Sequence, residues 1–267
     1  MTLVQLALVA LVALASSLTC GLVVWLASLQ RNNAALADRA WPVLIMVSAA
    51  VFVIGLLPLS QRVLVMLLLG AAWALRLSLF ITWRSWGHPE ERRYAQMRQR
   101  NQPHFGWKSL YRVFLLQATL AWLVATPFLA AAAGPGAARG WWVLDSLGLA
   151  LALFGLLFEA TADLQMAAFK ARATAPDAVM NKGLWRYSRH PNYFGESCLW
   201  WGLALFALAA GSPWALLSPV LITFLLLRVS GITLQEPHLK ERSPAYADYM
   251  RRTSAFLPLP PKAATFA

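Results

Sequence analysis

The segment from residue 181 to residue 196 carries side chains suited to binding an anion. It reads Asn-Lys-Gly-Leu-Trp-Arg-Tyr-Ser-Arg-His-Pro-Asn-Tyr-Phe-Gly-Glu. Pro191 suits the first turn of a helix, because its φ is fixed and it lacks an N–H that would have no partner there. The positive end of that helix would lie beside Arg186, Arg189 and His190. Such an arrangement is suited to a phosphate or a carboxylate.

Three further polar residues follow within one helical turn. Asn192 and Tyr193 add neutral hydrogen-bond donors, and Glu196 can accept a hydrogen bond from a ribose or an amide group. A basic loop that only touches anionic lipid headgroups is the simpler interpretation. Headgroup attraction does not require His, Asn, Tyr and Glu at such short spacing, so the segment favours a ligand site.

The elements that hold this segment are expected to be membrane helices. Of the 267 residues, 59% are hydrophobic and 13% are charged, which is far from the composition of a soluble domain. Seven apolar runs are long enough to span a bilayer, at about 3–29, 42–60, 63–83, 109–133, 141–166, 193–210 and 213–232. The first run lacks the basic start of a signal peptide, so we expect it to be retained. The predicted fold is all-α, a single domain over 1–267 built as an integral membrane bundle of seven transmembrane helices.

The basic residues predict the orientation of the bundle. The net charge is +12, and most of the 23 Lys and Arg follow the first, third, fifth and seventh runs. The even-numbered connections carry only Arg62 and Arg139. Under the positive-inside rule the N-terminus lies outside and the C-terminus lies in the cytoplasm. We therefore assign the positive charge to a membrane protein, with the lipid bilayer as partner and no nucleic acid.

Charged residues also occur within the apolar runs. Glu159, Asp163, Glu196, Arg228 and Arg76 come from four expected helices and converge on one depth, near the cytoplasmic ends. An ionisable group at membrane depth is costly and usually faces protein or a water-filled cavity. Ion pairs between helices, or side chains that extend to the interface, are the alternative. We expect a cytoplasm-facing polar cavity.

The residues of this region resemble a known family. The run Gly183-Leu184-Trp185-x-Tyr187-Ser188-Arg189-His190-Pro191-Asn192-Tyr193-x-Gly195-Glu196 is similar to the signature of membrane-embedded steroid 5-alpha-reductases and their bacterial relatives. The resemblance extends over about 155–260. It includes Asp163-Leu164-Gln165 with Phe169-Lys170, Arg228-Val229-Ser230-Gly231 with Glu236, and Tyr246-x-x-Tyr249-x-Arg251-Arg252-Thr253-Ser254-Ala255-Phe256-x-Pro258.

The resemblance implies an NADPH site in this C-terminal half. Asp163 and Lys170 match positions that contact the adenosine and phosphate portions of NADPH in the family. The other matching positions are Tyr187, Asn192, Glu196 and Arg228, with Arg189, His190 and Tyr193 as in the bacterial branch. Arg172 is added because of its charge. The chain has no Gly-x-Gly-x-x-Gly motif, so this site would not be a Rossmann one.

The implied reaction is hydride transfer from NADPH to the β-carbon of a 3-oxo-Δ4 steroid or a similar lipid enone. The protein would polarise the carbonyl with a hydrogen-bond donor. The family's animal members use a tyrosine one turn before the arginine of the third span, and a glutamate in the second span. Here Trp73 stands at the tyrosine position, and 42–60 holds no acid. Either Tyr94, Tyr111 or Gln117 takes over, or the substrate is not a steroid enone. No catalytic residue is assigned.

Two other functions stay open. Arg-His-Pro-x-Tyr-x-Gly also occurs in isoprenylcysteine carboxyl methyltransferases, which bind S-adenosylmethionine, so a lipid methyltransferase is the alternative enzyme. The cations Lys170, Arg172, Arg189 and Arg228 suit a dinucleotide better than that zwitterion. A transporter or lipid-binding protein is the third reading, although transport sites usually lie near the midplane.

The remaining features complete the expectations. His88, His104 and His238 lack metal-ligand spacing, so no metal site is expected. The polar stretch 86–106 is either a helix in contact with headgroups or a lid over the cofactor. The stretch 237–256 either lies in the interface or folds back under the cavity. We expect a monomer with a steroid-like hydrophobic substrate, in a bacterial inner membrane.

Overall fold

The computed structural model describes residues 2–172, 178–229, 231–233, 236 and 243–262. These residues form helices and connections, and no strand occurs among them. The chain divides into two compact units. The first unit comprises Met1–Asp145 and Leu205–Ser218, and the second comprises Ser146–Ala204 and Pro219–Ala267.

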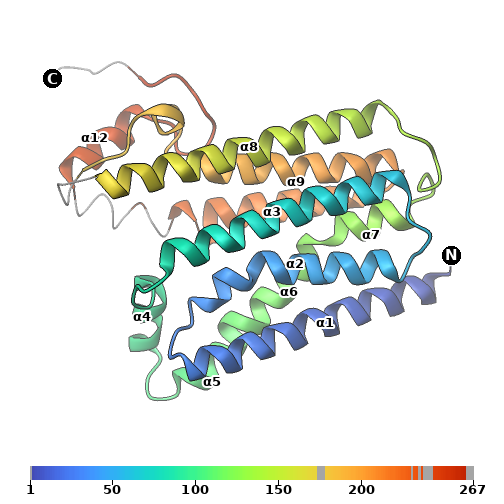
Figure 1. Ribbon diagram of the computed structural model, residues 1–267, viewed down its shortest axis with the longest axis horizontal. Helices are drawn as coiled ribbons and strands as arrows, with labels where there is room; N and C mark the ends of the chain where they lie inside the picture. Colours follow the sequence, from blue (N-terminus) through green and yellow to red (C-terminus); the bar gives the residue numbers. More distant parts are fainter. Residues whose placement is uncertain (1, 173–177, 230, 234–235, 237–242, 263–267) are drawn as a thin grey trace. The chain divides into compact units, whose positions relative to one another are not determined.

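The first unit is built from helices, and its long helices α1, α2 and α3 lie side by side (Figure 1). They are α1 (Leu3–Gln30), α2 (Leu36–Ile54), α3 (Gln61–Ser85), α4 (Arg92–Arg100), α5 (Phe105–Ser109), a π-helix (Leu110–Leu115), α6 (Leu116–Val124) and α7 (Thr126–Ala133). Helix α2 packs against α1, α3, α6 and α7. Large side chains such as Phe52, Trp73 and Phe128 are fully buried. The first unit therefore has its own apolar core around α2.

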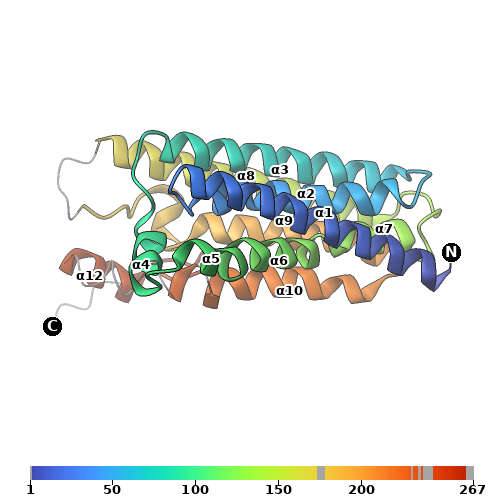
Figure 2. The same ribbon diagram turned by 90° about the horizontal axis from the view of Figure 1, so that it is seen from below.

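The fourth expected span is interrupted. Helix α5 passes through the π-helix into α6 (Figure 2), and α7 follows after Ala125 with Pro127 in its first turn. Pro127 has no N–H to donate, so it suits a helix start. Taken together, Phe105–Ala133 is a helical segment of 29 residues that is long and apolar enough to cross a bilayer.

Two buried charges join the start of α3 to the first turn of α8 and to the connection before it. Arg62 donates from Nε to Asp145 Oδ1 (2.5 Å) and from Nη2 to Asp145 Oδ2 (2.9 Å). Arg62 Nη1 also donates to the carbonyl of Gly136 (3.1 Å), and Asp145 accepts from the N–H of Trp142 (2.8 Å). The side chains are 2% and 0% exposed. A buried pair is tolerated when its remaining hydrogen-bonding groups also find partners, as they do here.

The second unit centres on two long helices. Helix α8 (Val143–Arg172), of which residues 146–172 belong to this unit, runs antiparallel beside α9 (Pro191–Ala209) in Figure 1. The unit also contains a 3₁₀ turn (Gly183–Arg186), most of α10 (Leu217–Phe224), a π-helix (Leu225–Val229) and α12 (Pro244–Arg252). A 3₁₀ turn (Pro213–Leu216) precedes α10.

Glycines set the close approach of α8 and α9. A Cβ on Gly155 would lie 2.4 Å from the backbone nitrogen of Leu199. A Cβ on Gly195 would lie 2.6 Å from the backbone nitrogen of Glu159, and one on Gly202 equally close to that of Ala152. Small residues allow the backbones of membrane helices to pack closely. The spacing of these glycines places the charged residues of α8 against the start of α9.

Gly155→Val should therefore separate α8 from α9. The added side chain meets backbone atoms, which cannot rotate away, so we expect a loss of about 1–3 kcal/mol or more in the free energy of unfolding. Thermal unfolding in detergent measures the loss. Gly140→Val is the control, because nothing lies within 4 Å of a Cβ at Gly140. Equal stability of the two variants would contradict the close packing.

The structure supports a multi-pass membrane protein and confirms five of the seven expected spans. The helices long and apolar enough to cross a bilayer are Leu3–Gln30, Leu36–Ile54, Gln61–Ser85, Phe105–Ala133 and Val143–Arg172. Helix α9, the sixth expected span, is not among them, because its first turns carry Asn192, Glu196 and Ser197. The seventh, Pro213–Val229, is an apolar helix that is shorter than these five spans.

Candidate functional site

Polar side chains of the second unit meet where α8 faces the start of α9. Asn192 donates from Nδ2 to Asp163 Oδ1 at 3.4 Å. Glu159 lies one turn before Asp163 on α8, against Gly195. Glu159, Asp163 and Glu196 are 2%, 6% and 7% exposed. We call Glu159, Asp163, Asn192 and Glu196 the acidic row.

The acidic row contains an acceptor with no partner. Asn192 Oδ1 is buried and accepts no hydrogen bond from any described residue. A buried amide oxygen without a donor costs free energy comparable to a lost hydrogen bond. A ligand hydroxyl or N–H would supply that donor.

The segment before α9 is fastened to α8. Gly183 has a φ of 59°, and a Cβ there would lie 2.5 Å from Gln165 Oε1. Gln165 Oε1 accepts from the N–H of Leu184 (2.9 Å), and Trp185 donates from Nε1 to the carbonyl of Ala162 (3.0 Å). A left-handed backbone with no room for a side chain requires glycine at position 183. These contacts fix the chain just before Arg189 and His190.

Arg189 and His190 share one carboxylate, that of Glu236. Arg189 donates from Nε and Nη2 to the two oxygens of Glu236 (2.7 and 3.0 Å), and His190 Nε2 lies 3.2 Å from Oε1. Arg189 Nη1 donates to the carbonyls of Met250 (2.7 Å) and Thr253 (3.0 Å). These contacts occupy the guanidinium, so a phosphate bound by Arg189 would have to displace one of them.

Burial alone would raise the pKa of Glu236. Hydrogen bonds from His190 and Arg189, together with their charges, outweigh burial and hold that pKa below its ordinary value. Glu236 is therefore a carboxylate at neutral pH. The sequence offered Glu236 only as part of the family pattern, because its partners lie more than forty residues earlier in the chain.

The described part of the C-terminal segment folds back onto residues 185–189. The N–H of Arg189 donates to the carbonyl of Ser254 (2.8 Å), and Ser188 Oγ donates to the carbonyl of Phe256 (2.8 Å). The Tyr249 hydroxyl donates to the carbonyl of Trp185. Of the two expectations for this segment, folding back is the observed one for 243–256, while 237–242 lies outside the described residues.

The other predicted site residues differ in exposure. His190 stacks on Tyr193 with ring centroids 5.3 Å apart. Lys170 and Arg172 lie exposed in the last turn of α8, Tyr187 is 42% exposed, and Arg228 is exposed on the π-helix Leu225–Val229. The structure thus brings together Asp163, Asn192 and Glu196, joins Arg189 and His190 through Glu236, and leaves the remaining cations at the surface of the second unit.

A polar cluster in the first unit contains two of the residues proposed to polarise a carbonyl. Tyr94 donates from its hydroxyl to Asp38 Oδ1 (2.6 Å), and Gln117 Nε2 lies 3.3 Å from both of those oxygens. Arg93 pairs with Asp38 Oδ2 at 2.6 Å. Burial first, and then the charge of Asp38, raise the pKa of Tyr94. Tyr94 is therefore a neutral donor. Tyr111 is 55% exposed.

Asp38 is the residue that the sequence prediction missed. The second span was expected to begin at Pro42, but α2 begins at Leu36 and contains Pro42 in its second turn. Asp38 therefore lies in the first turn of α2, where a negative charge is favoured by the helix dipole. An acid four residues before a proline at the edge of an apolar run was the available signal.

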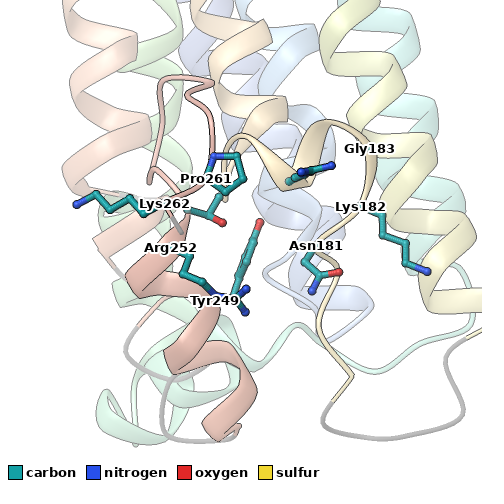
Figure 3. A pocket seen from close by; sticks show the side chains of 9 residues that line it. Asn181, Lys182, Gly183, Tyr249, Arg252, Pro261 and Lys262 are labelled. Carbon is teal, nitrogen blue, oxygen red and sulfur yellow. The ribbon is translucent and has the colours of Figure 1, made fainter. Parts of the chain in front are cut away.

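A pocket of the second unit lies next to the segment 181–186, on the side of the C-terminal residues (Figure 3). It has a volume of about 550 Å³, and its lining contains none of the ten predicted cofactor residues. In the described parts of the chain, no group of three or more His, Cys, Asp or Glu is placed to hold a metal ion.

Comparison with known proteins identifies the family. Residues 24–253 match the family model described as "Protein of unknown function (DUF1295)". The chain belongs to the DUF1295 family. The matched range contains the acidic row, Glu236 and the Asp38–Tyr94–Gln117 cluster.

The DUF1295 chain is also similar to a fungal protein. It is 29% identical over 279 residues to the uncharacterized protein C594.04c of Schizosaccharomyces pombe, covering 92% of this chain and 79% of that protein. No solved structure matches the chain.

Proposed function

We propose that the protein is an integral membrane reductase that uses NADPH to reduce the C=C bond of a 3-oxo-Δ4 steroid or a similar lipid enone. The observation that carries the proposal is the acidic row. Its carboxylates and its unpartnered amide oxygen are acceptors suited to ribose hydroxyls and to a carboxamide. The resemblance of 183–196 to steroid 5-alpha-reductases supports the same assignment.

In this proposal NADPH supplies the hydride, and the chain supplies binding and orientation. Asp163, Asn192 and Glu196 hold neutral polar groups, and the cations Lys170, Arg172 and Arg228 meet the phosphates. Arg189, His190 and Tyr193 position the segment that leads into α9. Polarising an enone carbonyl requires a hydrogen-bond donor, and that role is assigned to no residue of the described chain.

The membrane arrangement forms part of the same proposal. Seven spans, with α9 and Pro213–Val229 as the sixth and seventh, place the N-terminus outside and the basic connections in the cytoplasm. The polar start of α9 would then lie within the protein rather than in lipid. The proposed setting is a bacterial inner membrane, in which a monomer receives a steroid-like substrate from the bilayer.

A methyltransferase that uses S-adenosylmethionine is the second candidate. The acidic row contains three buried carboxyl groups, and carboxylates suit a sulfonium and an ammonium group. The motif shared with isoprenylcysteine carboxyl methyltransferases points the same way. The two candidates place different ligands against the same residues, so ligand binding separates them.

Ligand-induced stabilisation tests the proposal. NADPH at 100 times its Kd should stabilise the detergent-purified protein by about 2.7 kcal/mol, as measured by thermal unfolding. Asp163→Asn should weaken NADPH binding about tenfold, because it removes a charged acceptor. Asp248→Asn, an exposed acid of α12, should leave it unchanged. Stabilisation by S-adenosylmethionine and not by NADPH would overturn the reductase assignment.

A further inference from the structure

The pocket beside the segment 181–186 is lined by positive charge. Nine residues from two parts of the second unit enclose it, namely Asn181, Lys182, Gly183, Arg186, Tyr249, Arg252, Thr253, Pro261 and Lys262. Four of them are cations, and none of the lining residues in the described part of the chain is acidic. Like charges that share a concave site repel one another, and an anion relieves that repulsion.

Arg252 has a donor that no acceptor in the described part of the chain reaches. Its Nη2 donates to Asp248 at the surface of α12, but its Nε is buried and reaches no acceptor among the described residues. A buried guanidinium N–H without an acceptor is costly. The side chain as a whole is 41% exposed, so a turn of the guanidinium would bring this N–H to an anion in the pocket. Figure 3 shows Arg252 next to Tyr249, with Lys182 and Lys262 extending away at opposite rims.

The walls of the pocket are held by the backbone rather than by the cations. The N–H of Lys262 donates to the carbonyl of Arg252 (2.9 Å), and the N–H of Leu259 donates to the carbonyl of Tyr187 (3.0 Å). The Tyr249 hydroxyl donates to the carbonyl of Trp185, so its proton is already used within the protein. The charged ends of Lys182, Arg186 and Lys262 therefore remain available for a ligand.

We propose that this pocket binds a phosphate group, through Arg252 and Arg186 with the two lysines at its rim. An arginine guanidinium can donate two parallel hydrogen bonds to the oxygens of a phosphate, and a lysine ammonium adds a compact positive charge. A volume of about 550 Å³ has room for a phosphate group and for the molecule that carries it. The phosphate belongs either to an anionic phospholipid headgroup or to a water-soluble phosphate compound. The site shares no lining residue with the proposed cofactor site and stands independently of it.

Binding of two probes by the full-length protein tests the inference. Inorganic pyrophosphate is titrated calorimetrically into protein in zwitterionic detergent, and phosphatidylglycerol is compared with phosphatidylcholine in nanodiscs by thermal stability. Arg252→Gln should weaken the probe that binds by about tenfold, since one charged hydrogen bond is lost. Arg251→Gln is the matched control. It removes the same charge from the preceding residue, whose side chain is 72% exposed and lies outside the pocket.

The outcomes separate the sources and can overturn the inference. Pyrophosphate binding indicates a soluble ligand, and stabilisation by phosphatidylglycerol alone indicates a headgroup. Equal losses in Arg251→Gln and Arg252→Gln, or no binding of either probe, would overturn the site. Lys262→Gln replaces Arg252→Gln if the latter fails to fold. Asp163→Asn should leave probe binding unchanged, so failure of the NADPH proposal would be seen separately.

Discussion

Replacing Asp145 by asparagine should lower the free energy of unfolding by about 3–5 kcal/mol, the largest effect expected of any single substitution here. The variant keeps the shape of the side chain but leaves the guanidinium of Arg62, which is 2% exposed, without a countercharge. The other contacts of Arg62, to the carbonyls of Gly136 and Gly140, are neutral and do not compensate. Thermal or denaturant unfolding in detergent measures the change.

Two controls define the cause of this loss. Arg139→Gln removes an exposed charge from the same connection and should change stability by less than about 1 kcal/mol. The double variant Arg62→Met with Asp145→Leu should be more stable than Asp145→Asn, because no buried charge then lacks a partner. If the double variant were the less stable of the two, the desolvation argument would be wrong.

Glu236→Gln should release the C-terminal segment from residues 185–190. The substitution leaves Arg189 beside a neutral amide in a site where both side chains are 10% exposed, so we expect a loss of about 3 kcal/mol. Arg189 keeps its hydrogen bonds to the carbonyls of Met250 and Thr253 in this variant. We therefore expect the loss of stability to be confined to this contact region. Hydrogen exchange should become faster at the amides of Arg189, Thr253 and Leu259, whose acceptors belong to this contact region.

The pH dependence of this network has a defined sign. The pKa of Glu236 is lower in the folded protein than in the unfolded chain, so its contribution is complete above the ordinary glutamate value of about 4.3. That contribution is lost as the pH falls through the folded pKa. The difference between the wild type and Glu236→Gln should therefore be constant near neutral pH and shrink below about pH 4. Asp248→Asn, which removes an exposed acid of α12, should leave amide exchange at Arg189 unchanged.

The sequence was sufficient for the class of protein and for most of its helices. Apolar runs of about 18 residues or more predict membrane helices. In lipid the backbone N–H and C=O groups must bond to one another, and a helix satisfies them within the segment. The same reasoning predicted that Glu159, Asp163 and Glu196 lie at one depth, whereas the hydrogen bond between Asp163 and Asn192 came only from the structure. Helix ends were less accurate, and beginning α2 at Pro42 hid Asp38 from the search for an acid.

Only the tertiary structure decided which charged side chains pair with other groups of the protein. Arg189 and Arg252 look alike in the sequence, yet Arg189 is occupied by Glu236 and two carbonyls. Arg252 keeps a buried N–H that no described residue accepts. The pairing of Arg62 with Asp145 and the pocket at Arg252 likewise join segments more than 60 residues apart. A charged side chain finds its partner through the path of the whole chain, because Coulomb and hydrogen-bond energies depend on distance in space and not on separation in sequence.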